Sequence, residues 1–399
     1  GAGSIGLAMS SRFTNEEAFL AKKIVEKFDA VVPGSFSLMS LSGLADILGY
    51  DSSTTGYEEL SNADVILSIG SVAENHPIMG IKLKNAAAGK SKLVSINDRK
   101  TRLEEWATTS VNPKNSIEFF KGLFKALLEM GYIKKEQVTK TTTGFEELEK
   151  YVQAATVDES VKNIAKVYGD SAKAVIVIDE DSVTSGTIKL LADMAIATGK
   201  IGNAQRGLII VRSKNNSQGL LDQGFTTTAS ELINQLEAGK LKAMVILGED
   251  PVSLNDAYAG LLSKLEFLAV GDMVKTKTAD LADVILPLVS YAETTGTFTR
   301  SDGKVQNVQA AIHPLTGYSN FDLLLAMAQR LGYAYKSLED VQAAMANNQV
   351  ANKGGGFATA DGKAHLAVPE DVVAFKERVF SDTIEIKFNN FLIENGIKS

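Results

Sequence analysis

The stretch Ala63-Asp64-Val65-Ile66-Leu67-Ser68-Ile69-Gly70-Ser71 predicts a buried β-strand that ends in a glycine turn. Its run of β-branched and other apolar residues fits a strand covered on both faces, as in a parallel sheet. The first five residues recur as Ala282-Asp283-Val284-Ile285-Leu286. The repeat is either an accident of composition or the trace of two related α/β lobes, and the sequence leaves both interpretations open.

Strand-like runs alternate with longer helix-periodic stretches along the chain, which predicts an α/β fold with mainly parallel sheets. Eight strands are too many for one mononucleotide-binding half, so we expect two Rossmann-like lobes. One helix is predicted to begin at Thr14 and Asn15, with acidic side chains in its first turn. The predicted strands are 5–9, 65–69, 92–96, 174–178, 208–211, 243–247, 267–270 and 283–286, and further helices are 116–130, 184–198, 231–238, 255–265 and 321–331.

Composition excludes several classes of partner. The 399 residues include 48 acidic and 41 basic side chains, a net charge of −7, without a basic run, so we expect no nucleic-acid partner. The longest apolar run, 323–328, is far shorter than the about 20 residues of a membrane span, which predicts no membrane insertion. Residues 1–10 lack the basic region of a secretory signal, so we expect none there.

The chain has no cysteine, so it cannot build disulfides, thiolate catalysts or cysteine-ligated clusters. Its three histidines, His76, His313 and His365, are scattered, which argues against a chelating metal site. No Gly-x-Ser-x-Gly nucleophile elbow and no phosphate-binding Walker loop occur. We therefore predict no metal site and no catalytic residue in this chain.

Two loops follow predicted strands at positions where α/β sheets bind ligands. Gly70 and Ser71 follow the predicted strand 65–69 and precede Glu74 and His76, in either a helix-capping loop or a binding loop. The segment Asn97-Asp98-Arg99 follows the next strand, where nucleotide-binding lobes hold ribose hydroxyls, although a simple polar turn fits equally well.

Taken together, several ordered words resemble the molybdopterin oxidoreductases over roughly residues 4–333. Within that family the chain is most similar to formate dehydrogenase catalytic subunits and to the large iron–sulfur G subunit of NADH-quinone oxidoreductase. The words that carry the resemblance are Ser10–Glu17, Ala63–Ser71, Thr198–Gly202, Asn215–Gly219, Gly248–Pro251, Ala279–Pro287, Glu293–Thr299 and Gly303–Gln306.

The resemblance implies one Rossmann-like lobe inserted into another, similar to the core formed by domains 1–3 of formate dehydrogenases. The first lobe would comprise 1–34 and 225–345, the inserted lobe 35–224, and a C-terminal tail 346–399. That tail contains a glycine-rich hinge at 352–356 and a helical stretch near 370–379. Iron–sulfur clusters are expected only in domains upstream of this sequence.

Several family positions have changed. Active members place a molybdenum-ligating Cys or selenocysteine in a stretch that corresponds to 36–43, where Ser40 is the alternative ligand here. Gly70-Ser71-Val72, Asn97-Asp98-Arg99 and Lys114-Asn115-Ser116 replace the family's Gly-Ser-Asn, Asp-Pro-Arg and Gly-Thr-Asp. Hydrogen bonds to charged groups contribute about 1.5–3 kcal/mol each, so these losses would weaken the binding of a dinucleotide by on the order of a thousandfold.

The second lobe keeps the pattern better, at Gly248, Glu249, Asp272 and Thr276, although these residues also suit turns and strand ends. We therefore expect a scaffold portion of a protein similar to the NADH-quinone oxidoreductase G subunit, without a cofactor or activity of its own. Its partners would be other members of a respiratory or hydrogen-linked electron-transfer complex, on the cytoplasmic side and peripheral to the inner face of the cell membrane. The alternative is part of a formate dehydrogenase that binds molybdopterin guanine dinucleotide.

Overall fold

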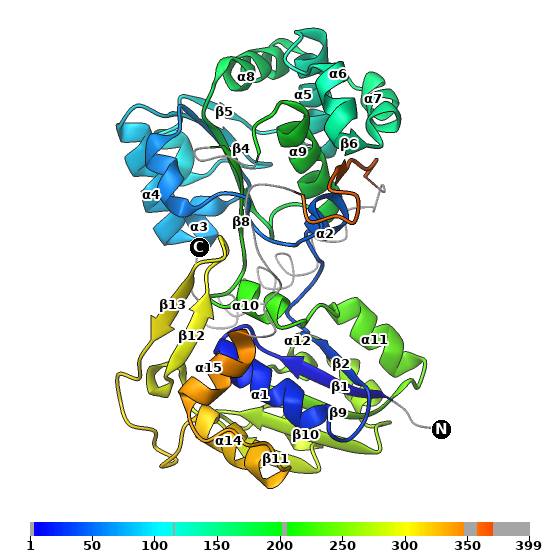
Figure 1. Ribbon diagram of the computed structural model, residues 1–399, viewed down its shortest axis with the longest axis vertical. Helices are drawn as coiled ribbons and strands as arrows, with labels where there is room; N and C mark the ends of the chain where they lie inside the picture. The colour runs from blue at the N-terminus through cyan, green and yellow to red at the C-terminus, as the bar shows by residue number, and fades with distance from the viewer. Residues whose placement is uncertain (1–3, 115, 202–205, 347–356, 370–399) are drawn as a thin grey trace, which may run out of the picture. The chain divides into compact units, whose positions relative to one another are not determined.

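The computed structural model describes residues 4–114, 116–201, 206–346 and 357–369. The chain divides into two compact units, each with its own parallel sheet (Figure 1). Unit 1 comprises 1–41 and 214–352, and unit 2 comprises 42–213 and 353–399. The chain leaves unit 1 after residue 41 and returns after residue 213, compared with predicted lobe boundaries at 34 and 224.

Unit 1 is built on a five-stranded sheet with the order β11-β10-β9-β1-β2, in which every neighbouring pair is parallel. Its strands are β1 (Ser4–Met9), β2 (Val31–Gly34), β9 (Leu241–Leu247), β10 (Phe267–Asp272) and β11 (Val284–Pro287). Its helices are α1 (Asn15–Val25), α10 (Ser217–Asp222), α11 (Ala229–Glu237), α12 (Pro251–Leu254), α13 (Tyr258–Leu262), α14 (Asn320–Arg330) and α15 (Leu338–Ala346), with short 3₁₀ turns η3 (Ala279–Leu281) and η4 (Tyr291–Glu293).

Unit 2 has a second five-stranded parallel sheet with the order β5-β4-β3-β7-β8. Its strands are β3 (Val65–Ile69), β4 (Lys92–Ile96), β5 (Thr109–Val111), β7 (Ala174–Asp179) and β8 (Gly207–Val211). Its helices are α2 (Leu44–Leu48), α3 (Val72–Asn75), α4 (Pro77–Ala88), α5 (Ser116–Glu129), α6 (Lys135–Thr141), α7 (Phe145–Gln153), α8 (Glu159–Asp170) and α9 (Ser185–Ala197), with η1 (Tyr57–Asn62) and η2 (Arg102–Glu105).

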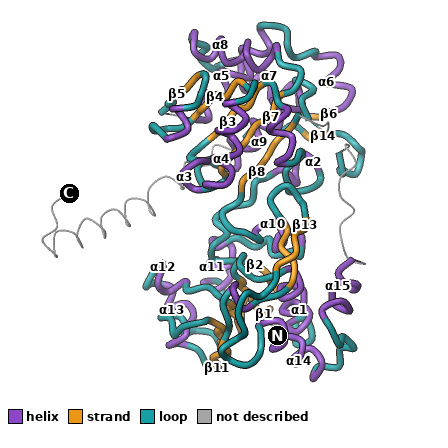
Figure 2. The backbone as a smooth tube through the Cα atoms, turned by 90° about the vertical axis from the view of Figure 1, so that its left-hand side faces the viewer, coloured by secondary structure: helices purple, strands orange, loops and turns teal. Residues whose placement is uncertain are grey.

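Helices cover both faces of the unit 2 sheet, with α4 on one side of its strands and α5 and α9 on the other (Figure 1), and Figure 2 gives the view from the α4 side. On β3, Val65 and Leu67 pack in the core formed with α5, α8 and α9. The alternate residue Ile66 points to the opposite face, where it packs with α4. Alternate side chains of a strand point to opposite faces, so two apolar covers explain the nearly continuous apolar run. The predicted α/β fold with mainly parallel sheets is confirmed.

A β-hairpin in unit 1, absent from the prediction, is formed by β12 (Gly296–Thr299) and β13 (Val305–Val308). It is held against the first turn of α1. The side-chain amide of Asn15 donates to the hydroxyls of Thr297 and Thr299, at 3.0 Å each, and Glu16 accepts from the Thr297 backbone N–H at 2.8 Å. Two of the sequence words that carry the family resemblance therefore contact each other.

The structure corrects two predicted helix details. Thr14 alone is the N-cap of α1, and Asn15 is its first helical residue. The helix predicted at 255–265 is wrong as a single element, because α12 ends at Leu254 and α13 covers only Tyr258–Leu262. Asn255 is extended between them, and its side chain accepts a hydrogen bond from the Ala257 N–H, which starts a new turn.

Part of the predicted tail belongs to the unit 2 fold. The two-residue strand β14 (Ala364–His365) pairs in parallel with β6 (Thr142–Thr143), and Ala364 is fully buried. The positive-φ residue Gly144 lies against this segment, because a Cβ there would be 2.0 Å from the Leu366 carbonyl oxygen. The predicted hinge at 352–356 and helix at 370–379 lie outside the described residues.

Candidate functional site

The topological switch point of unit 2 lies between β3 and β7, because β4 and β5 extend the sheet in one direction and β8 in the other. Open α/β sheets bind ligands outside the carboxyl ends of their strands at such a point. Gly70 and Ser71 follow β3 there, Asn97 follows β4, and Asp179 ends β7. A small pocket at this edge is lined by Ile69, Gly70, Ile96, Asn97, Asp98, Pro113, Lys114, Ser116, Phe120, Ser182 and Val183.

Asp179 is the acceptor on which the side chains at this edge converge. Its carboxylate is fully buried and accepts from Asn75 Nδ2 at 2.8 Å and Ser182 Oγ at 2.5 Å. It also lies 3.3 Å from His76 Nε2 and accepts from the Asp181 N–H at 3.2 Å. Burial alone would raise the pKa of Asp179, but the hydrogen bonds from His76, Ser182 and Asn75 lower it below the usual value. The carboxylate is therefore ionised at neutral pH.

Ser182 closes the same edge from the other side. Its hydroxyl accepts a hydrogen bond from the Ser71 N–H at 3.1 Å, and the Ser71 hydroxyl accepts from Asn97 Nδ2 at 3.2 Å. Gly70 has φ +86°, and a Cβ on it would lie 2.5 Å from Ser182 Cβ. The turn thus needs glycine both for its backbone conformation and for the close approach of Ser182.

The structure brings together four of the six site residues predicted in this unit, Gly70, Ser71, His76 and Asn97. Glu74 points elsewhere and accepts the Arg102 backbone N–H at 2.7 Å, as an exposed loop contact. Arg99 is exposed on the loop after β4, away from the hydrogen bonds of Asp179. The hydrogen-bonded cluster is therefore centred on Asp179, a residue that the prediction did not include.

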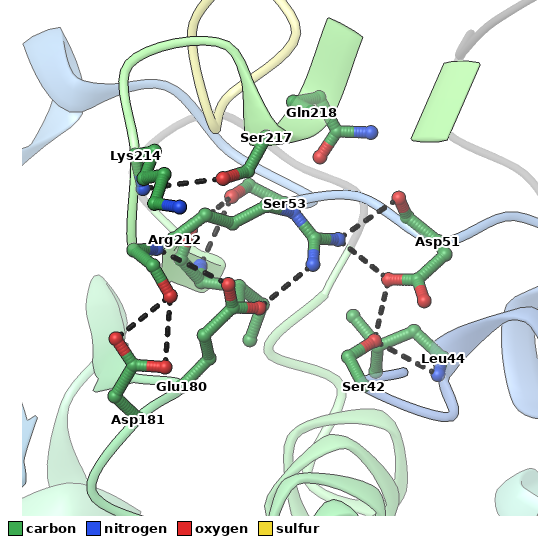
Figure 3. A network of polar contacts seen from close by, with 12 residues as sticks. Ser42, Leu44, Asp51, Ser53, Glu180, Asp181, Arg212, Lys214, Ser217 and Gln218 are labelled. Carbon is green, nitrogen blue, oxygen red and sulfur yellow. Dashed lines mark hydrogen bonds and ion pairs between the residues drawn. The ribbon is translucent and has the colours of Figure 1, made fainter. Parts of the chain in front are cut away.

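The end of β8 carries a buried ion-pair network (Figure 3). The guanidinium of Arg212 donates to Glu180 at 2.8 Å and to the Asp51 carboxylate at 2.6 Å. Ser42 donates to Asp51, and the Ser213 N–H donates to Glu180 at 3.2 Å. Because Arg212 is 3% exposed, removing it would leave two carboxylates without their cation, which typically costs about 3–5 kcal/mol.

In unit 1 the switch point lies between β1 and β9, and it is occupied by acidic side chains of the chain itself. Glu249 is buried and accepts from Ser35 Oγ at 2.5 Å and from the N–H groups of Phe36 at 2.9 Å and Ser37 at 3.1 Å. Gly248, at φ +67°, leaves room for Phe13, whose ring would be 2.7 Å from a Cβ there. Glu249 thus anchors the segment that follows β2.

The predicted residues Asp272 and Thr276 form local loop contacts. One Asp272 oxygen accepts the Met273 N–H at 2.7 Å, and the Thr276 hydroxyl accepts the Ala279 N–H at 3.1 Å. Nearby, Asp250 caps α12 and accepts from the N–H and hydroxyl of Thr278. In the structure these side chains therefore hold the turns that follow β9 and β10.

The first turn of α1 adds two more buried carboxylates at the same edge of unit 1. Glu16 accepts from Thr297 and from Gln342 Nε2, and Glu17 completes a capping box with Thr14. Burial raises the pKa of Glu17 to about 7, against the lowering effect of its hydrogen bonds with Thr14. Among the described residues, Glu17 Oε1 has no hydrogen-bond partner.

No group of three His, Cys, Asp or Glu side chains that could hold a metal occurs within the described ranges. In the stretch 36–43, where the sequence resemblance predicts a metal-ligand turn, Phe36 packs on Tyr258 with ring centroids 6.3 Å apart. Ser37 accepts from Lys214 Nζ at 2.7 Å. The alternative oxygen ligand, Ser40, is only half-buried.

Asp179, Ser182, Arg212 and Asp51 are absent from the site predicted from the sequence. A signal for the first was present, because Asp179-Glu180-Asp181 directly follows the predicted strand 174–178. The rule that drew attention to Gly70 and Asn97, a polar residue at the carboxyl end of a parallel strand, applies to Asp179 as well. The partners of Arg212 are 32 and 161 residues away along the chain, a distance over which one sequence carries no pairing signal.

The sequence model of the family described as "Molybdopterin oxidoreductase" matches residues 1–318. Among curated proteins, F420-dependent formate dehydrogenase subunit alpha of Methanocaldococcus jannaschii is 27% identical, covering 84% of this chain and 59% of that protein. Formate dehydrogenase H of Escherichia coli is 27% identical over 81% of this chain and 54% of its own length. NADPH-Fe(3+) oxidoreductase subunit alpha of Geobacter sulfurreducens is 25% identical, with corresponding shares of 83% and 46%.

Acetylene hydratase from Pelobacter acetylenicus has a similar fold, with a TM-score of 0.70 and 16% sequence identity, covering 91% of this chain and 63% of that chain. The chain thus spans about half to three fifths of the lengths of the curated relatives named above. Across the part of the chain that the structure describes, no helix has the length and apolar character needed to cross a membrane.

Proposed function

The chain belongs to the molybdopterin oxidoreductase family, and from this premise we propose that it is a scaffold portion of an electron-transfer protein similar to the G subunit of NADH-quinone oxidoreductase. In this role it binds neither molybdenum nor a guanine dinucleotide. Its two α/β units hold neighbouring domains and subunits in place, and iron–sulfur clusters in domains upstream of this sequence carry the electrons.

The observation that carries this proposal is the buried Asp179 carboxylate at the unit 2 switch point. A dinucleotide phosphate would have to enter beside an ionised carboxylate that already uses the local donors. Two like charges about 4 Å apart at an effective dielectric constant of about 20 repel by about 4 kcal/mol. That repulsion corresponds to about a thousandfold weaker binding, before the changed side chains at Val72, Asn97 and Lys114 are considered.

Metal analysis of the full-length native subunit tests the proposal. We expect inductively coupled plasma mass spectrometry to find far less than one molybdenum atom per chain. We also expect no pterin fluorescence after oxidation of the denatured protein. One molybdenum per chain, together with the pterin signal, would refute the scaffold role.

A formate dehydrogenase-type enzyme is the second candidate, supported by the names of the Methanocaldococcus and Escherichia relatives. On that alternative the full-length protein binds molybdopterin guanine dinucleotide and oxidises formate. The same preparation distinguishes the two, because stoichiometric molybdenum with formate-dependent dye reduction supports the enzyme and the absence of both supports the scaffold.

We further propose that the partners are other subunits of a respiratory or hydrogen-linked complex on the cytoplasmic side, peripheral to the inner face of the membrane. Two of the relatives are named as alpha subunits, which supports a multi-subunit setting. Affinity purification of the tagged native protein under mild conditions should recover stoichiometric partner subunits. Recovery of the tagged protein alone would contradict this part of the proposal.

A further inference from the structure

The three consecutive acidic residues at the carboxyl end of β7, Asp179, Glu180 and Asp181, make different contacts. Asp179 turns into the switch-point edge of unit 2, where it meets Asn75, His76 and Ser182. Glu180 turns to Arg212, and Asp181 accepts from the Ser213 hydroxyl at 2.7 and 2.8 Å. Only the first of the three therefore places its charge among the donors of the cluster, while the charge of Glu180 is balanced by a cation.

The donors around Asp179 form a set that suits an anion. An amide, an imidazole nitrogen, a hydroxyl and a backbone N–H all lie within 3.3 Å of its two oxygens. Converging donors of this kind are how proteins hold carboxylate and phosphate oxygens. The backbone N–H of Ser71, which follows the glycine turn, is taken by Ser182 and not by Asp179.

We propose that the Asp179 carboxylate fills the position at the unit 2 switch point where the phosphate of a dinucleotide would otherwise bind. Ser182 closes the glycine turn beside it. Removing the carboxylate would convert this closed edge into a binding site for inorganic pyrophosphate. The inference deepens the proposed function and rests on it, since it gives the physical reason why unit 2 holds no dinucleotide.

The test uses the 399-residue chain and its histidine signals. With three histidines in the sequence, His76, His313 and His365, proton–carbon NMR spectra of the rings are simple to assign. His76 reports on the site, His313 lies in unit 1, and His365 lies beside Asp361 at 2.9 Å. The variants are Asp179→Ala and the matched control Asp181→Ala, which removes a neighbouring acid whose partner is Ser213.

We expect millimolar pyrophosphate to move the His76 signal and raise the melting temperature of the Asp179→Ala chain by several degrees. Wild type and Asp181→Ala should show neither change, and the other two histidine signals should stay in place in all three proteins. The proposal would be overturned if pyrophosphate moved the His76 signal of wild type as much as that of Asp179→Ala. The phosphate position would then be accessible with the Asp179 carboxylate in place.

A folded Asp179→Ala chain without any pyrophosphate response would overturn the proposal too. If that variant does not fold, Asp179→Asn keeps the volume and removes the charge, and it is expected to give the same response with weaker affinity. If the variants do not bind pyrophosphate but the full-length protein lacks molybdenum, only the inference about Asp179 is refuted and the scaffold role stands. Molybdenum in the full-length protein would refute the scaffold role whatever the pyrophosphate result.

Discussion

The sequence Ala-Asp-Val-Ile-Leu occurs once in each unit, and its two copies have opposite surroundings. In unit 2, 63–67 leads into the central strand β3, where Val65, Ile66 and Leu67 are buried between two helical layers. In unit 1, 282–286 forms most of β11 at the sheet edge, where Val284 is 41% and Ile285 50% exposed. The same residues form a parallel strand in both places, so local sequence specifies the strand but not its burial.

The position in the sheet also decides the role of the loop after each copy. β3 borders the switch point, and its glycine turn joins the hydrogen-bonded cluster around Asp179. β11 has a neighbour on one side only and ends at Pro287, which has no N–H to continue a ladder. The copy in unit 2 therefore bears on the candidate site, and the copy in unit 1 bears on an edge.

The largest expected difference between the copies is in stability. Ile66→Ala removes a fully buried side chain and should lower the free energy of unfolding of unit 2 by about 2–5 kcal/mol. Ile285→Ala, at a half-exposed edge, should cost unit 1 less than about 1 kcal/mol. Hydrogen exchange followed by mass spectrometry measures each unit separately, and fluorescence of Trp106 in unit 2 checks the first value. Equal losses would show that β11 is covered.

The range of the interactions explains which features the sequence could predict. All eight predicted strands exist, because apolar runs bounded by turn residues are a local signal. The hairpin β12–β13 was missed although its pairing is local, between 296–299 and 305–308. Its anchor could not be predicted, since Asn15 and Thr297, whose contact holds the hairpin, are 282 residues apart. At the candidate site the loops after β3 and β4 were predicted, but the role of Asp179 depends on neighbours from separate elements, which only the fold brings together.

The two units also differ in how their buried carboxylates titrate. The pKa of Asp179 is lowered, whereas that of Glu17 in unit 1 is raised from 4.5 to about 7. Folded Glu17 binds its proton more tightly than the unfolded chain does. Its contribution to the free energy of unfolding is therefore fully present below about pH 4.5 and is lost as the pH rises towards 7. Between about pH 4.5 and 8 wild type should lose on the order of 3 kcal/mol more than Glu17→Gln.

Urea unfolding monitored by circular dichroism across that pH range measures the Glu17 effect. Glutamine keeps a capping-box side chain, so the variant should fold with α1 intact. Exposed Glu237 in the same unit provides the control, because Glu237→Gln should retain the wild-type pH dependence. A Glu17→Gln curve parallel to wild type would mean that Glu17 is ionised in the fold.

The turn after β3 gives a smaller expected effect with a close control. Gly70→Ala places a Cβ 2.5 Å from Ser182 Cβ in a left-handed conformation and should cost about 2 kcal/mol. Gly131→Ala in the same unit has a similar φ of +75° but nothing within 4 Å, and should cost about 1 kcal/mol. Thermal unfolding monitored by Trp106 fluorescence compares them, and equal costs would show that Ser182 does not press on the turn.

The smallest expected effect is at the acidic position of the repeat, where substitution should cost the edge copy more stability than the buried copy. Asp283, in the edge copy, accepts the Leu268 N–H at 2.8 Å, whereas the Asp64 carboxylate has no hydrogen bond within the described residues. Asp283→Ala should therefore cost unit 1 about 1 kcal/mol, while Asp64→Ala should change unit 2 by less than about 0.5 kcal/mol. Hydrogen exchange of β10 and β3 peptides resolves the two. The opposite result would be a larger loss of stability for Asp64→Ala than for Asp283→Ala, the same order as for the isoleucine substitutions. Burial in the sheet would then outweigh hydrogen bonding at the acidic position of the repeat as well.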